Sequence, residues 1–69
     1  MQAIIQELES RKSEIQTAVD LLFKANMKIT DWDVPEADDK QAAEILLGYI
    51  QERIDEIRAD VQAGKYDTY

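Results

Sequence analysis

Apolar residues recur every seven positions along the first part of the chain, and this spacing constrains the fold more than any other feature. The row consists of Met1, Leu8, Ile15, Leu22 and Ile29. Neighbouring apolar residues widen this row into a stripe on one face of a helix: Ile4, Ile5, Ala18, Val19 and Ala25. Neither Gly nor Pro interrupts the pattern, so the sequence predicts a helix over about residues 2–27.

A break and a second stripe follow. Pro35 cannot continue a helix interior, and Asp38 with Gln41 three residues later fits a capping box that begins a helix. The second stripe steps by four and three: Ala43, Leu47, Ile50, Ile54, Ile57 and Val61. Gly64 is a typical helix stop. We therefore expect a connection over about residues 28–37, a helix over about 38–63 and a short tail over 64–69.

These elements predict an all-α fold in a single domain, residues 1–69. A short connection brings the second helix back antiparallel to the first, which makes a two-helix hairpin. In that hairpin Leu22 lies near Leu46 or Leu47, Ile15 near Ile50 or Ile54, and Leu8 near Ile57 or Val61. One hairpin covers only one side of each stripe, so we expect a coiled-coil-like homodimer that forms a four-helix bundle.

The composition argues for oligomerisation and against most chemistry. A core of 69 residues supplies roughly 3–5 kcal/mol, and a chain without Cys has no disulfide to support it. Without Cys or His we expect neither a metal site nor a cofactor. Glu52 and Glu56 could serve as a general acid and base only in a cleft, which a slim hairpin lacks. The sequence therefore predicts a protein that is not an enzyme.

The formal net charge of -7 disfavours nucleic acid and anionic membranes as direct ligands, because both repel an acidic surface. The uncharged stretch that starts at Ile45 ends before Glu52, far short of the roughly 20 apolar residues that span a bilayer. The N-terminus lacks the basic start of a signal peptide. We therefore expect a cytoplasmic protein.

The predicted connection and the helix ends beside it combine aromatic, apolar and acidic residues. Apolar residues there exceed what a two-helix seam can cover, and residues 29–39 carry five acids and no base. We interpret this end as a partner-binding surface for a basic protein. Its anchors are Trp32 and Tyr49, its apolar floor is Phe23, Met27 and Ile45, and its charge selection comes from Asp31, Asp33 and Glu36. The alternative is that Trp32 folds over the core and the apolar residues form only a dimer interface.

A second acidic feature is the stripe of Glu52, Glu56 and Asp60, which are four residues apart on one helix face. Such a stripe can imitate a run of phosphates and bind a DNA-binding protein. The alternative is a solvated face, whose field Arg53 and Arg58 dilute.

The function that this sequence favours is that of a small acidic interaction module of bacterial or phage type. It would act as an adaptor, inhibitor or regulator through the loop end of the hairpin. Two alternatives stay open at this point: a DNA-mimic inhibitor of a DNA-binding or host-defence protein, and a purely structural dimerisation module.

Overall fold

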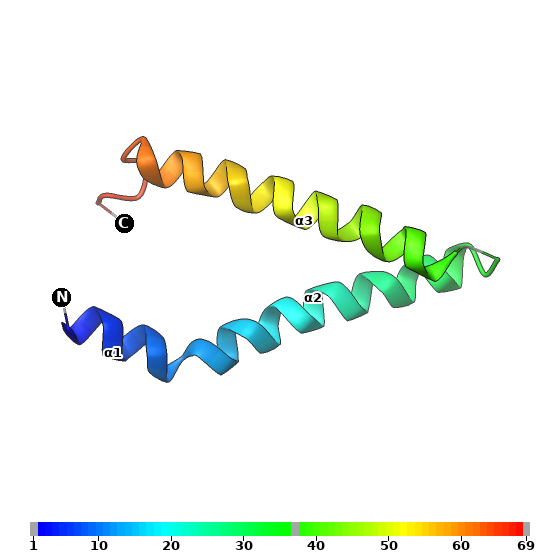
Figure 1. Cartoon of the computed structure of the whole chain (residues 1–69), viewed down its shortest axis with the longest axis horizontal. Helices are drawn as coiled ribbons and strands as arrows, with labels where there is room; N and C mark the ends of the chain where they lie inside the picture. The colour runs from blue at the N-terminus through cyan, green and yellow to red at the C-terminus, as the bar shows by residue number, and fades with distance from the viewer. Residues whose placement is uncertain (1, 37, 69) are drawn as a thin grey trace.

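A computed structural model describes residues 2–36 and 38–68 of the chain, and in that part all regular structure is helical (Figure 1). The helices are α1 (Gln2–Ser10), α2 (Lys12–Asp33) and α3 (Asp39–Gln62). The predicted all-α class is confirmed. Three residues with predicted places lie outside the described part: Met1 of the apolar row, Ala37 of the connection and Tyr69 of the tail.

The first predicted helix differs from the observed one at its C-terminal end. The helix continues to Asp33 instead of ending near Met27, so the predicted boundary was wrong and residues 28–33 belong to α2. The helical conformation is first lost at Val34, with φ -133° and ψ 77°, although its N–H still bonds the Thr30 carbonyl at 2.8 Å. The reason is that Pro35 restricts the residue before it, and neither Gly nor Pro lies between Met27 and Val34.

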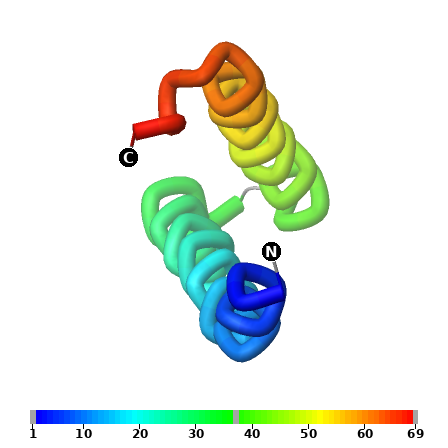
Figure 2. Tube along the Cα trace, turned by 90° about the vertical axis from the view of Figure 1, so that its left-hand side faces the viewer, coloured from blue at the N-terminus to red at the C-terminus, as the bar shows by residue number. Residues whose placement is uncertain are grey.

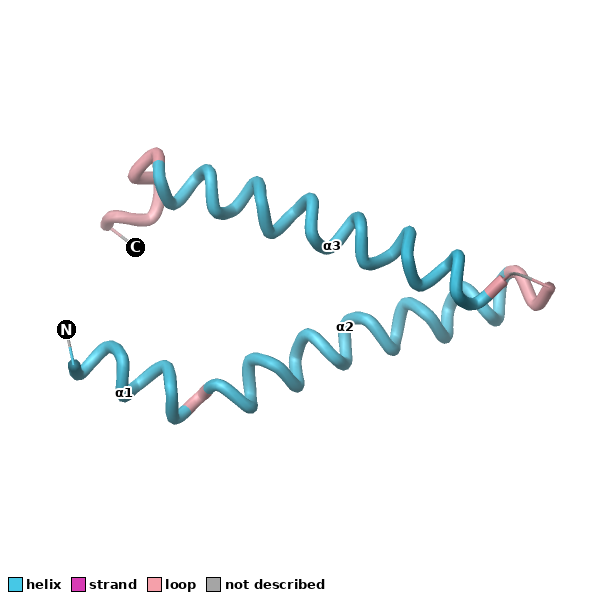
Figure 3. The backbone as a smooth tube through the Cα atoms, viewed as in Figure 1, coloured by secondary structure: helices cyan, strands magenta, loops and turns pink. Residues whose placement is uncertain are grey.

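The first helix is also interrupted at Arg11, which separates α1 from α2 (Figure 3). The Arg11 N–H bonds the Leu8 carbonyl at 3.2 Å, three residues back instead of four. The Ser10 hydroxyl donates to the Glu7 carbonyl at 2.7 Å, in the turn that ends there. Serine hydroxyls that bond back to the preceding turn bend helices, and this gives the break a local cause that apolar spacing does not reveal.

Both ends of α3 carry the capping residues that the sequence indicates. At the start, an Asp38 carboxylate oxygen accepts the Lys40 N–H at 3.0 Å and the Gln41 N–H at 3.4 Å. At the end, Gly64 adopts φ 85°, its N–H bonds the Val61 carbonyl at 3.1 Å, and the Lys65 N–H bonds the Asp60 carbonyl at 3.0 Å. These two bonds are those of a Schellman motif, which closes the helix.

The helices α2 and α3 approach each other next to the connection and diverge toward the two chain termini (Figures 1 and 2). The radius of gyration is 16.0 Å, whereas a compact domain of this length has about 11 Å. No residue in the described ranges 2–36 and 38–68 is buried, and most of the large apolar side chains are exposed. Phe23, Met27, Leu46 and Ile50 are partly covered. The described residues therefore form apolar faces but no closed core.

Because the helices diverge, the side chains that lie near each other across them differ from the expected pairs. Leu22 shares a hollow with Ile50, Ile54 and Ile57, further along α3 than the expected Leu46 or Leu47. Leu8 and Ile15 line a hollow formed by residues 5–16 alone, so α3 provides none of the partners expected for them there. The helices separate toward the termini, which leaves this end of both stripes uncovered.

None of the helices in the described part of the chain has an apolar stretch that could span a lipid bilayer.

The two glycines provide a matched test of the α3 geometry. Gly64→Ala should lower the free energy of unfolding by about 1–2 kcal/mol, because an L-residue is disfavoured at positive φ, and its new Cβ would lie 3.0 Å from an Asp67 carboxylate oxygen. Gly48→Ala should raise it by about 0.8–1.0 kcal/mol, because Gly48 is inside the helix and a Cβ there meets nothing within 4 Å. Urea unfolding followed by circular dichroism measures both, and shifts of the same sign would contradict the assigned helix end.

Candidate functional site

The end of the molecule beside the connection, which we call the loop end, carries the predicted partner-binding residues. Asp31, Trp32 and Asp33 form the last turn of α2, and Glu36 lies in the connection. Asp38 caps α3 and Asp39 is its first residue. The acidic run is therefore divided between two helix ends and a short turn.

Trp32 is the most exposed large apolar side chain of the described residues, at 86%. It lies over a shallow hollow on α2 together with Ala25, Lys28 and Ile29, which we call the Trp32 face. Two residues along a helix are about 200° apart, so Trp32 points almost opposite to Thr30, which faces α3. Trp32 does not fold over the space between the helices.

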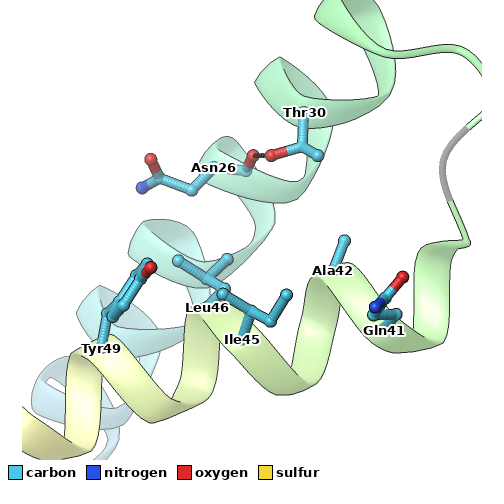
Figure 4. A pocket seen from close by; sticks show the side chains of 7 residues that line it. All are labelled: Asn26, Thr30, Gln41, Ala42, Ile45, Leu46 and Tyr49. Atoms are coloured by element: carbon cyan, nitrogen blue, oxygen red, sulfur yellow. Dashed lines mark hydrogen bonds between the residues drawn. The ribbon is translucent and has the colours of Figure 1, made fainter.

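A separate groove of about 380 Å³ lies between α2 and α3 at the loop end (Figure 4). Asn26 and Thr30 line it from α2, where the Thr30 hydroxyl donates to the Asn26 carbonyl at 3.0 Å and the Asn26 amide to the Leu22 carbonyl at 2.8 Å. These bonds satisfy polar groups within their own helix. The rest of this loop-end groove comes from α3: Gln41, Ala42, Ile45, Leu46 and Tyr49.

The structure thus divides the predicted partner-binding surface between two faces. Ile45 and Tyr49 lie together in the loop-end groove, whereas Trp32 belongs to the Trp32 face. Phe23 and Met27 are half-buried on α2 and line neither hollow. Asn26 and Thr30 were not among the predicted site residues, although their spacing of four residues places them on one helix face.

A third hollow, of about 370 Å³, lies near the middle of α2 and α3, and we call it the central face. Leu22 from α2 and Ile54 from α3 are half exposed there, at 49% and 40%. The complete lining is Val19, Leu22, Tyr49, Ile50, Arg53, Ile54 and Ile57. This hollow takes side chains from both helices near their middles, and Arg53 is the one charged residue in its lining.

Like charges meet across the connection. The pKa of Asp39 is raised above its usual value, first by a side-chain hydrogen bond with Asp31, then by the negative charge of Asp31, with smaller contributions from desolvation and from Asp38. Asp31 at the end of α2 therefore lies close to Asp39 at the start of α3. The loop end concentrates negative charge to the point where it disfavours ionisation of one of its own carboxyl groups.

Cations compensate most of the predicted acidic stripe. Glu56 accepts a hydrogen bond from Arg53 at 3.1 Å, and Asp60 pairs with Lys65 at 3.6 Å. Glu52 has no ion pair within the described part of the chain. The stripe lies on one face of α3, but two of its three charges are locally balanced.

The residues described contain no group of three or more His, Cys, Asp or Glu side chains placed to hold a metal ion. No protein-family model, curated protein or solved structure matches this chain.

The contact between Asp31 and Asp39 predicts a specific effect of pH. A raised pKa in the folded state means that ionised Asp39 destabilises the fold above that pKa, and stability rises as pH falls through it. Asp31→Asn removes the neighbouring charge and provides an amide donor, so the Asp39 pKa should fall toward its ordinary value. A carboxyl-carbon NMR titration measures this shift.

Asp33→Asn is the control, because it removes the same charge and Asp33 does not contribute to the shift at Asp39. An Asp39 pKa that is equal in the wild type and in Asp31→Asn would contradict the contact.

Proposed function

We propose that this chain is a small, acidic, non-catalytic interaction module that binds a basic surface on another protein through its loop end. It would act as an adaptor, inhibitor or regulator, in the cytoplasm of a bacterium or as a phage product. The finer architecture that we propose is an antiparallel two-helix hairpin that dimerises into a four-helix bundle. No catalytic step is part of this proposal.

The observation that carries the proposal is the exposure of Trp32 beside uncompensated carboxylates. An 86% exposed Trp leaves a large apolar surface in water. Trp is enriched among the interface residues that contribute most to binding energy when a partner buries them, and the charges around such residues select the partner. Asp31, Asp33 and Glu36 have no ion pair within the described residues, so their charge is available to a basic partner.

The loop-end groove is a second, separate site on the side of α3. Ile45 and Tyr49 provide an apolar site that an inserted side chain could fill, since the polar groups of the groove on α2 bond within their own helix. We propose that the Trp32 face is the main contact with the partner and that the groove is a separate, additional contact.

Mimicry of DNA by Glu52, Glu56 and Asp60 has less support, because Arg53 and Lys65 balance two of these three charges. A purely structural dimer would use the central face and leave Trp32 without a role.

Two triple variants with matched charge separate these functions. The loop triple is Asp31→Asn, Asp33→Asn and Glu36→Gln, and the stripe triple is Glu52→Gln, Glu56→Gln and Asp60→Asn. Each variant removes three negative charges and keeps the side-chain shapes. Wild type, both triples, Trp32→Ala and Trp32→Phe would be immobilised and exposed to the same bacterial lysate at low salt, with captured proteins quantified by mass spectrometry.

The proposal predicts a protein that wild type and the stripe triple retain equally and that Trp32→Ala and the loop triple lose by about thirtyfold, as expected for a hot-spot residue. Trp32→Phe should retain part of the binding. Loss with the stripe triple alone would instead assign the function to DNA mimicry. If no captured protein depends on either set of residues, the purely structural dimer remains as the function.

A further inference from the structure

The exposed area of the whole chain indicates how much surface a partner on the central face would have to cover. The chain exposes 6309 Å², whereas a compact monomer of its mass exposes about 4,400 Å². A dimer that removed this excess of roughly 1,900 Å² from each chain would bury about 3,800 Å² in total, which lies within the range of obligate homodimer interfaces. The excess exposed area of one chain is therefore of the size that pairing with a second copy would bury.

The position of the central face suits contact between two identical copies. Leu22 lies midway along α2, and Ile50 and Ile54 lie midway along α3. In a two-fold symmetric dimer the same patch meets itself, so a patch near the middle of the long axis lies next to the symmetry axis. The face is apolar apart from Arg53, whose side chain already pairs with Glu56.

The distribution of charge selects the relative orientation of the two copies. Residues 29–39 hold five acids and no base, whereas residues 1–28 hold four acids and four bases. Parallel copies would place ten carboxylates at one end, where crowding within a single chain already raises the pKa of Asp39. Antiparallel copies place each loop end beside the partner's termini, and the loop ends are then separated along the 49 Å long axis, well beyond a Debye length of about 8 Å.

We propose that two copies of this chain pair antiparallel through their central faces, with the acidic loop ends at opposite ends of the dimer. This arrangement rests on the dimerisation included in the proposed function and adds its interface and orientation. It leaves the Trp32 face of each copy uncovered. The dimer therefore presents two equivalent loop ends, one at each end, to basic partners.

Two adjacent leucines test the interface. Leu22→Asp places a charge on the central face, whereas Leu21→Asp places the same charge on a side chain that is 63% exposed and does not line that face. Sedimentation velocity should give a dimer for the wild type and for Leu21→Asp, and a 7.9 kDa monomer for Leu22→Asp. Equal dissociation of both variants would overturn the interface.

A milder substitution keeps this test valid if Leu22→Asp loses its helical structure. Ile54→Ala also lies on the central face and favours helix formation. It should weaken the dimer at least about tenfold while circular dichroism stays helical. Unchanged dimer affinity in this variant would also overturn the interface.

Distances between spin labels test the orientation of the two copies. The chain contains no Cys, so each variant with one introduced Cys carries its label at that position. A label at the loop end, through Asp33→Cys, should give an intermolecular distance comparable with the 49 Å long axis. A label near the middle of α3, through Gln51→Cys, should give a much shorter distance. A short distance from the Asp33→Cys label would overturn the antiparallel orientation while leaving dimerisation intact, and a monomeric wild type would overturn both.

Discussion

Two helices joined by a short turn can cover only part of each other, and this geometric limit governs the rest of the structure. The helix ends are well defined by Asp38, by Gly64 and by the restriction that Pro35 imposes on Val34. These local features specify where α2 ends and where α3 begins and ends. They do not provide a core, and no described residue is buried. The stability that packing normally provides has to come from another surface.

Much of the secondary structure could be predicted from the sequence, because it depends on local signals. Apolar spacing identified both helical segments, and Asp38 and Gly64 marked the limits of α3. The break at Arg11 was missed because it arises from the Ser10 hydroxyl bonding backward, which spacing does not reveal. The end of α2 was placed too early because Thr30, Asp31 and Asp33 resemble loop residues. Only Pro35 acts as a true breaker.

The candidate site was predictable in composition but not in geometry. Trp32, Tyr49 and the acidic residues all lie at or near the loop end, as their sequence positions imply. The helical register then separates Trp32 from the groove that contains Tyr49, because Trp32 points almost opposite to Thr30. The proximity of Asp31 and Asp39 also required the fold, since it depends on how the turn brings the two helix ends together.

The proposed functions follow from this division of surfaces: the central face completes the core with a second copy, and the loop end stays available for a basic protein. The proposed dimer is tested by the helicity of the wild-type chain across a dilution series, with its mass measured on the same samples. Circular dichroism at 222 nm should weaken as dimer dissociates to monomer, because helices without a covered face are marginal in water. A monomer that stays fully helical at every concentration would contradict the proposed dimer.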